Sequence, residues 1–262
     1  MMEIDNEVLK QIWERKSVRV FTEQKISESE RKLILDAAIQ APSAGNQQFY
    51  TILDIKDEKI KAKMADLCDH QPFIKEAPMV LVFLADSRRW KKVYEEAGLE
   101  TRPVGPGDAL LAVADACIAA QNAAVAAQSM GIGSCYIGDV LENCESMREI
   151  LQIPDGVLPA AMLVFGYPTK QQMDRKKPAR FKRDYIVQEN VYRDRLGAEH
   201  RNALTDRAKA GGDSHFDYDR WVKAFAERKY ESAFSREMSR SAAMYLKDYI
   251  FEGESNGKDG EE

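Results

Sequence analysis

The hydrophobic and polar positions of the chain form alternating blocks with two different periods. In one set of blocks apolar residues recur at helical spacing, and Ser27 with Glu30 forms a capping box at the start of one block. The other set consists of short continuous apolar runs, typical of buried strands. The predicted helices are residues 5–14, 27–41, 59–68, 108–130 and 142–151. The predicted strands are residues 49–55, 79–85, 134–137 and 159–166.

This succession predicts an α/β (mixed α+β) fold, in which helices flank both faces of one central sheet. After about residue 197 the chain becomes strongly polar, with a helical pattern. The apolar anchors of this part are Trp221, Phe225, Tyr230 and Phe234. We therefore predict a domain at 1–196 and a helical C-terminal extension at 197–262. The Gly-rich, acidic tail at 253–262 is expected to be disordered.

Residues 108–130 are nearly all Ala, Leu, Val and Ile, without Gly or Pro. Alanine is the best helix former, so this segment predicts one long helix, with Asp108 as its cap and Gly131 as its stop. Its length of about 35 Å would span a bilayer. Asp115 and the amide side chains argue against lipid on every face. We expect the buried central helix of a soluble domain, with enough apolar surface to share with a second subunit.

The composition narrows the class of protein. The chain has 262 residues, of which 44% are hydrophobic, so it can bury a sizeable core. Its formal charge of −5 gives no support for nucleic-acid binding. The N-terminus lacks the pattern of a signal peptide, so we expect a cytoplasmic protein that does not bind membranes. Four scattered cysteines and three histidines make a metal site improbable and favour reduced thiols.

Three segments are candidates for binding one anionic, planar ligand. Arg15, Ser17 and Arg19 alternate, so in an extended segment they face one side and suit a phosphate or the electron-rich edge of a heteroaromatic ring. Residues 42–48 offer amides and hydroxyls without charge. The basic run at 175–183 can close over a phosphate. Each segment also has an ordinary interpretation: solvated arginines, a helix-ending loop and a solvated face.

Two further patterns limit the chemistry. Gly131-Ile132-Gly133 lies after a helix, whereas a dinucleotide-binding motif lies at the start of one. The segment is therefore not expected to bind a phosphate as such a loop does. It permits tight passage of the backbone and leaves the N–H groups near Ile137 and Gly138 for a ligand atom. The sequence contains no evident Ser-His-Asp or Cys-His arrangement, and we predict no catalytic nucleophile.

Six segments in a fixed order resemble the FMN-dependent nitroreductase family. They are ERKSVRVF, APSAGNQQ, KEAPMVLVFLAD, the Ala-rich helix with GIGSCYIG, LVFGYP and KPARFKRD, and they cover roughly residues 10–195. The resemblance implies a nitroreductase-like fold, FMN as cofactor, NAD(P)H as electron donor, and a homodimer with two flavin sites at its interface. Residues 196–262 lie beyond the family's usual core.

The resemblance also assigns residues to the FMN site. The first FMN-binding segment contains Arg15, Lys16, Ser17 and Arg19, with Arg15 at the phosphate and Arg19 at the N1/O2 edge of the isoalloxazine. The loop with Pro42, Ser43, Ala44 and Asn46 would reach the flavin that the other subunit binds. Gln71 would face the pyrimidine edge, and the strand end at Tyr136, Ile137 and Gly138 would approach N5 and O4. Arg180 and Arg183 would close on the phosphate, with Lys182 as a competitor.

The resulting hypothesis is an oxidoreductase that takes a hydride from NAD(P)H on FMN and reduces a nitroaromatic, a quinone or a similar small-molecule acceptor by a ping-pong mechanism. The reactive atom is flavin N5. Trp90 and Tyr94 either line the substrate side or only pack together. Two alternatives remain open: a non-catalytic flavin-binding redox sensor, and a dehydrogenase or dehalogenase with the same fold.

Overall fold

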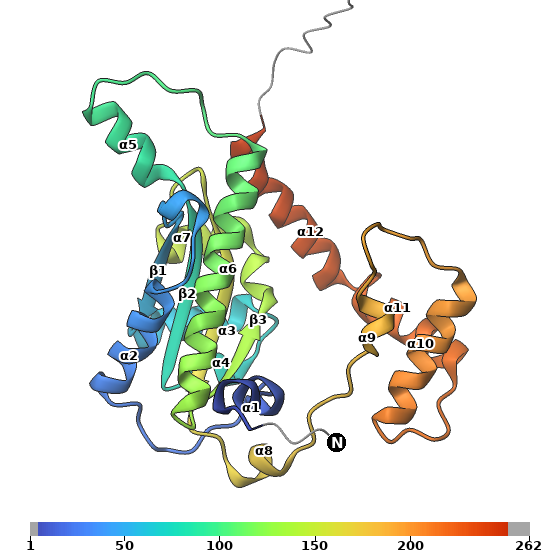
Figure 1. Cartoon of the computed structure of the whole chain (residues 1–262). Coiled ribbons are helices and arrows are strands. Elements are labelled where there is room, and N and C mark those ends of the chain that lie inside the picture. Colours follow the sequence, from blue (N-terminus) through green and yellow to red (C-terminus); the bar gives the residue numbers. More distant parts are fainter. Residues whose placement is uncertain (1–4, 251–262) are drawn as a thin grey trace, which may run out of the picture. The chain divides into compact units, whose positions relative to one another are not determined.

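The computed structural model describes residues 5–250 and contains a four-stranded sheet in which every neighbouring pair is antiparallel (Figure 1). The strands are β1 (Tyr50–Ile55), β2 (Met79–Asp86), β3 (Gly133–Ile137) and β4 (Val157–Gly166). Their order is β1-β2-β4-β3, so β1 and β3 form the two edges. Strand β2 is central and buried at every position except its last. This burial explains its continuous apolar sequence.

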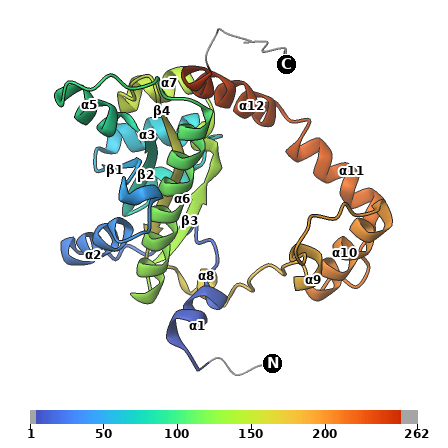
Figure 2. The ribbon, with the colours of Figure 1, turned by 45° about the horizontal axis from the view of Figure 1, so that its top comes forward.

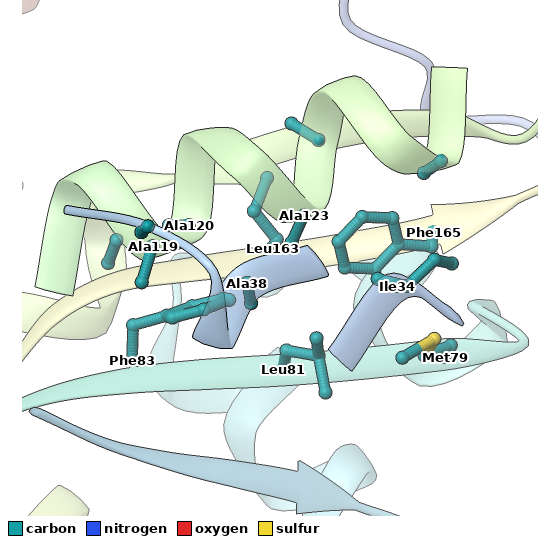
Figure 3. Packing of buried hydrophobic residues seen from close by; sticks show 14 of the residues in the cluster. Ile34, Ala38, Met79, Leu81, Phe83, Ala119, Ala120, Ala123, Leu163 and Phe165 are labelled. Carbon is teal, nitrogen blue, oxygen red and sulfur yellow. The ribbon is translucent and has the colours of Figure 1, made fainter. Parts of the chain in front are cut away.

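One face of the sheet is covered by α2 (Glu28–Ile39) and α6 (Pro106–Ser129). Helix α6 contacts α2 and all four strands. Figure 3 shows Ala119, Ala120 and Ala123 of α6 near the sheet residues Phe83, Leu81 and Leu163. Small alanines let the helix backbone approach the larger side chains of the sheet, which fill the layer. The long Ala-rich segment is therefore the core helix.

The opposite face is covered by α3 (Glu58–Leu67), α4 (Pro72–Glu76) and α7 (Cys144–Leu151), which pack against a second hydrophobic cluster. Figure 2 shows α3 and α7 on the side of the sheet away from α6. Met64, Ile74 and Met147 from these helices are fully buried there. The prediction of one central sheet with helices on both faces is confirmed. Within residues 5–250, α6 alone has the length and apolar composition of a membrane span.

Helix termini agree with their sequence signals, with one correction. The Ser27–Glu30 capping box is present, because each side chain bonds the backbone N–H of the other residue. Helix α6 begins at Pro106, two residues before the predicted start at Asp108, because proline fits the first turn of a helix. Asp108 accepts the backbone N–H of Gly105 at 2.8 Å, so it caps from inside the helix. Gly131 follows the helix with a φ of 74°.

The remaining elements of this part are shorter. They are α1 (Glu7–Glu14), η1 (Ala44–Asn46), α5 (Arg88–Glu96), η2 (Gly138–Leu141), α8 (Lys170–Asp174) and η3 (Lys247–Tyr249). The predicted apolar face of α1 is solvent-exposed, with Val8 at 59% and Leu9 at 45%. This face therefore contributes nothing to the core of the single chain.

The chain divides into two compact units. The first comprises the chain up to Met173 and the segment from Glu237 onward, and the second is Asp174–Arg236. The second contains α9 (Arg183–Ile186), α10 (Gly197–Ala210) and α11 (Tyr218–Lys229). In it the rings of Trp221 and Phe225 stack with centroids 4.6 Å apart. The predicted boundary at 196/197 falls inside this unit, so a domain division there stays a prediction.

Helix α12 (Ala233–Leu246) enters the first unit at Glu237. Its residues Ser241 and Tyr245 are buried, as is the following Tyr249. The backbone N–H of Cys144 donates to Ser241 Oγ at 2.9 Å, and Tyr249 Oη donates to the carbonyl of Gly156 at 2.6 Å. The end of the extension is thus part of the first core. The acidic tail for which we predict disorder lies outside the described residues.

Candidate functional site

The segment that contains Arg15 and Arg19 runs along the edge strand β3. The N–H of Val18 donates to the carbonyl of Ser134 at 3.0 Å, and Ser17 forms a parallel bridge with Ser134. The approach requires Gly133, because a Cβ there would lie 2.6 Å from Cγ2 of Val18. The GIG pattern therefore permits close backbone passage, as its position after a helix predicts.

Arg15 has an unsatisfied hydrogen-bonding group. Its side chain is half-buried, and Nη1 is a buried atom without a hydrogen-bond partner in the part of the chain that the structure describes. Arg15 lies near Tyr136, whose pKa burial raises to about 12 although the positive charge of Arg15 opposes the rise. A buried donor without a partner costs about 1–3 kcal/mol. An anionic ligand would remove that cost.

Arg19 follows on the same segment but is more exposed. Its guanidinium carbon lies 5.9 Å from the centroid of the Phe73 ring, at the start of α4. Its backbone N–H donates to Gln172 Oε1 at 3.3 Å, and the Gln172 side chain is buried. Lys16 donates to the backbone carbonyl of Met173. This segment is thus held on two sides, by β3 and by α8.

Gln71 lies at the N-terminus of α4, close to the end of β3. Its Nε2 donates to the carbonyl of Cys68 at 2.8 Å and to Oδ2 of Asp139 at 2.6 Å. Asp139 is the residue after Gly138, so these bonds join the cap of α4 to the strand end. The structure therefore brings Gln71 and Gly138 together, as the resemblance implies.

The end of β3 is open at one residue. Ile137 is buried, and Tyr136 donates its hydroxyl hydrogen to Gln121 Oε1 at 3.3 Å. Gly138 is exposed, and a Cβ there would meet no atom within 4 Å. The backbone at Gly138 is thus accessible to a ligand. Arg15, Arg19, Gln71 and this strand end form one cluster, which we call the β3-edge half of the site.

The loop predicted to reach the flavin of a second subunit lies elsewhere. It leads into β1, the opposite edge of the sheet, and three strand spacings amount to roughly 14 Å. Asp115, buried in α6, accepts the N–H groups of Ala44 at 3.0 Å and Phe49 at 3.1 Å. Ser43 Oγ accepts the N–H of Gln48 at 3.0 Å. We call residues 42–48 the β1-edge half.

Trp90 and Tyr94, the predicted substrate residues, line a pocket of about 470 Å³. Their ring centroids are 6.0 Å apart, and the indole N–H of Trp90 donates to the carbonyl of Gln47 at 2.7 Å. The pocket therefore borders the β1-edge half, and Phe49 also lines it. The pair both packs together and faces a cavity.

Arg180 and Arg183 belong to the second unit. Within that unit, Lys182 pairs with Asp206 at 2.6 Å, and this hydrogen bond raises the pKa of Lys182. The ammonium group of Lys182 is thus already engaged, which favours the two arginines as phosphate ligands. Their assignment stays a prediction.

Sequence reasoning assigned no role to three residues that shape the site. Asp115 was visible as a charge on the alanine face of the helix, and its spacing from Ala112 and Ala119 places it on the buried side. Asp139 and Glu142 lie in a short acidic stretch after Gly138 without a recognisable motif. Burial and the negative charge of Asp139 raise the pKa of Glu142 to about 7.

Comparisons with known proteins agree with this geometry. The model of the family described as Nitroreductase family matches residues 12–167. A Bacillus subtilis protein named FMN reductase (NAD(P)H) is 29% identical over 249 residues, covering 92% of this chain and 91% of its own length. Another B. subtilis protein, named FMN reductase (NADPH), is 29% identical, covering 94% of this chain and 97% of its own length.

The fold is also similar to that of solved structures. The structure of NfrA2 from B. megaterium superposes with a TM-score of 0.78 at 26% identity, covering 95% of this chain and all of the other. The similarity thus extends over both units of the chain, beyond the residues that the family model matches.

Proposed function

The chain belongs to the nitroreductase family, and from this premise we propose that it passes electrons from NAD(P)H to a nitroaromatic, a quinone or a related acceptor by a ping-pong mechanism. FMN is its cofactor and NAD(P)H is its electron donor. The proposal extends this to the class of acceptor and to the order in which the two substrates react.

The observation that carries the proposal is the buried Nη1 of Arg15, which has no hydrogen-bond partner among the described residues, on a segment that runs along β3 toward its open end at Gly138. A phosphate oxygen is the natural partner of a guanidinium, because the planar fork of donors matches its geometry. The residues present therefore fit FMN, with Arg15 at the phosphate and the ring toward Gly138. In the second unit, Arg180 and Arg183 are the further phosphate ligands that we propose.

When bound, FMN supplies the hydride-accepting atom N5 and carries the electrons between the two substrates. The chain's own residues hold the ring and set the charge around it. The cation of Arg19 would stabilise negative charge that develops at the N1/O2 edge. The backbone at Ile137 and Gly138 would donate toward N5 and O4, and Ser17 and Lys16 would complete the segment that orients the ring.

The strand end also supports the ping-pong order. The backbone around Ile137 and Gly138 and the adjoining protein wall would cover one face of the ring, so the donor and the acceptor would occupy the other face in turn. The pocket beside Trp90 and Tyr94 borders the β1-edge half, and we propose that these rings contact the acceptor. Release of the product or a loop movement would then limit turnover.

We also propose a cytoplasmic homodimer with two FMN sites at its interface. The β1-edge and β3-edge halves lie at opposite edges of one sheet, so a second copy is needed to bring them together. Helix α6 exposes Leu110 at 72% and α1 exposes Val8 at 59%, leaving apolar surface for such a contact. A permanent dimer of this kind buries well over about 2,000 Å².

The catalytic proposal is tested by the absorption spectrum of the purified protein and by anaerobic mixing with NADH and with NADPH. We expect bound flavin, bleaching by at least one nucleotide, and reoxidation by a nitroaromatic or a quinone. Initial rates should give parallel lines in double-reciprocal plots. Flavin that neither nucleotide bleaches within minutes would refute the reductase and favour a redox sensor.

Light scattering at micromolar concentration tests the dimer. We expect twice the mass of the chain, and Leu110→Arg should shift the protein toward monomer because it places a charge on the proposed contact. Leu99→Arg, at a leucine that is 56% exposed and lies outside α6, is the matched control. A wild-type monomer that retains FMN would contradict the dimer.

A further inference from the structure

The side-chain amide of Gln71 is fixed in one orientation. Its nitrogen donates one hydrogen to the carbonyl of Cys68 and the other to the carboxylate of Asp139. Both partners only accept in this arrangement, so a flipped amide would place its oxygen against two acceptors. The backbone is held too, because the N–H of Gln71 donates to the carbonyl of Ala65 at 3.0 Å.

The consequence is that Gln71 presents its oxygen. Among residues 5–250 no hydrogen bond uses the Oε1 atom of Gln71. The amide lies beside Gly138, at the open end of β3. A ligand at this place therefore meets a hydrogen-bond acceptor and finds no amide donor.

Asp139 lies among acidic and uncharged groups. No salt bridge to Asp139 occurs in the described part of the chain. The groups that face it are Gln71 at the cap of α4, Glu142 at the end of η2, and Cys68 after α3, and Asp69 acts on Glu142 as a like charge. Glu237 of α12 acts on Glu142 as a further like charge.

Glu142 completes the arrangement. Glu142 is 4% exposed, and burial together with the negative charge of the nearby Asp139 raises its pKa to about 7. The protonated form of Glu142, favoured below neutral pH, would place a further donor beside the Asp139 carboxylate. The hydrogen bond from Gln71 Nε2 reaches Asp139 Oδ2, and no described cation pairs with that carboxylate.

We propose that Asp139 is a positioning residue for the cofactor: by holding the amide nitrogen of Gln71 inward, it presents the amide oxygen to the imide N–H of FMN. The pyrimidine edge of the isoalloxazine carries this single N–H between two carbonyls, so a fixed acceptor selects it. The inference rests on the proposed FMN site. It adds Asp139 as the residue that makes Gln71 accept, and not donate, the hydrogen bond to the flavin.

The test compares the dissociation constants of FMN and of FMN methylated at its imide nitrogen, measured by fluorescence titration of the apoprotein. The wild type should bind the methylated flavin roughly 10-fold more weakly, because it loses one hydrogen bond and leaves an acceptor unpaired. Gln71→Leu should reduce this ratio to less than about threefold. Asp139→Ala should do the same, although it changes no atom of Gln71.

Two further variants separate positioning from a merely structural effect. Asp139→Asn keeps an acceptor oxygen and should restore most of the discrimination, with circular dichroism confirming that each variant folds. The double variant Asp139→Ala/Gln71→Leu should bind FMN no more weakly than Gln71→Leu alone, because Asp139 acts through Gln71.

The outcomes separate this inference from the proposed function. Wild-type protein that binds FMN but does not discriminate against the methylated flavin would overturn the inference alone. Unchanged discrimination in Asp139→Ala, or additive losses in the double variant, would overturn it as well. Wild-type protein that binds no FMN would instead remove the proposed function.

Discussion

The two halves of the predicted FMN site are constructed in opposite ways. In the β3-edge half, Arg15 has a buried donor and Gln71 has an amide oxygen that find no partner among residues 5–250, and the backbone at Gly138 is open. In the β1-edge half, the N–H groups of Ala44 and Phe49 are already bonded to the carboxylate of Asp115. The β3-edge half therefore has polar groups available to a ligand. In the β1-edge half, two backbone N–H groups are already bonded within the chain and fix the shape of the loop.

The difference separates two tasks of one binding site. A surface that binds a charged cofactor must leave groups unsatisfied until the ligand arrives, and this costs stability. A loop that reaches into another subunit's site must keep its shape without the ligand, and a buried carboxylate that accepts two N–H groups achieves this. Substitutions in the β1-edge half should therefore lower the stability of the fold, whereas substitutions in the β3-edge half should weaken FMN binding or slow flavin reduction.

The largest effect is expected from Asp115→Ala. The substitution removes two hydrogen bonds to a charged group and leaves the N–H of the buried Phe49 unpaired. We expect the free energy of unfolding to fall by about 3–6 kcal/mol. Thermal unfolding of the apoprotein measures it, at roughly 2–4 °C for each kcal/mol. A melting temperature within one degree of the wild type would show that Asp115 does not hold the β1-edge half.

Arg15→Ala should have the converse effect. FMN affinity should fall about 10- to 150-fold, because one charge-assisted contact to the phosphate contributes about 1.5–3 kcal/mol. The melting temperature of the apoprotein should not fall, since the buried Nη1 has no hydrogen-bond partner to lose in the described part of the chain. Arg88→Ala is the matched control, at an arginine whose guanidinium donates to the carbonyl of Asp155 at 3.4 Å. An unchanged dissociation constant in a fluorescence titration would remove Arg15 from the phosphate site.

Arg19→Ala tests the β3-edge half at the proposed position of the flavin ring, whereas Arg15→Ala tests it at the phosphate. Its guanidinium is exposed near Phe73, so its loss should leave the fold intact. The rate at which NAD(P)H bleaches the flavin should fall roughly 10- to 100-fold, because a charge at the N1/O2 edge is lost. Stopped-flow absorbance under anaerobic conditions measures this rate. Normal bleaching with weakened FMN binding would place Arg19 among the binding residues alone.

Much of the fold follows from local sequence. The continuous apolar run of β2, the Ser27–Glu30 capping box and the Ala-rich helix each have a local physical cause, and the structure confirms all three. The family and its cofactor were predicted from the order of six motifs and are confirmed by the comparisons. The predicted start of α6 at Asp108 is two residues late, because proline at position 106 fits the first turn of a helix.

The contacts within the site were less predictable. Gln71 and Asp139 are 68 positions apart, and only the packing of α4 beside η2 brings them together. The alternation of Arg15 and Arg19 predicts that they share a face. It does not predict the two hydrogen bonds that hold the segment, from the N–H of Val18 to β3 and from the N–H of Arg19 to Gln172. Such contacts depend on tertiary neighbours that a periodic pattern does not identify.

The smallest effect concerns the pH dependence of the β3-edge half. Burial and Asp139 raise the pKa of Glu142 to about 7, above the ordinary value of a glutamate. Over the interval between these two values the folded chain binds more protons than the unfolded chain at this position. Stability therefore falls as the pH rises through this window and levels off above about pH 7.

Glu142→Gln keeps a donor near Asp139 and cannot ionise. It should therefore be more stable than the wild type at pH 8, with a difference that shrinks toward pH 5. Melting temperatures of the two proteins across this range measure the effect. Parallel pH profiles would mean that Glu142 titrates alike in the folded and the unfolded chain.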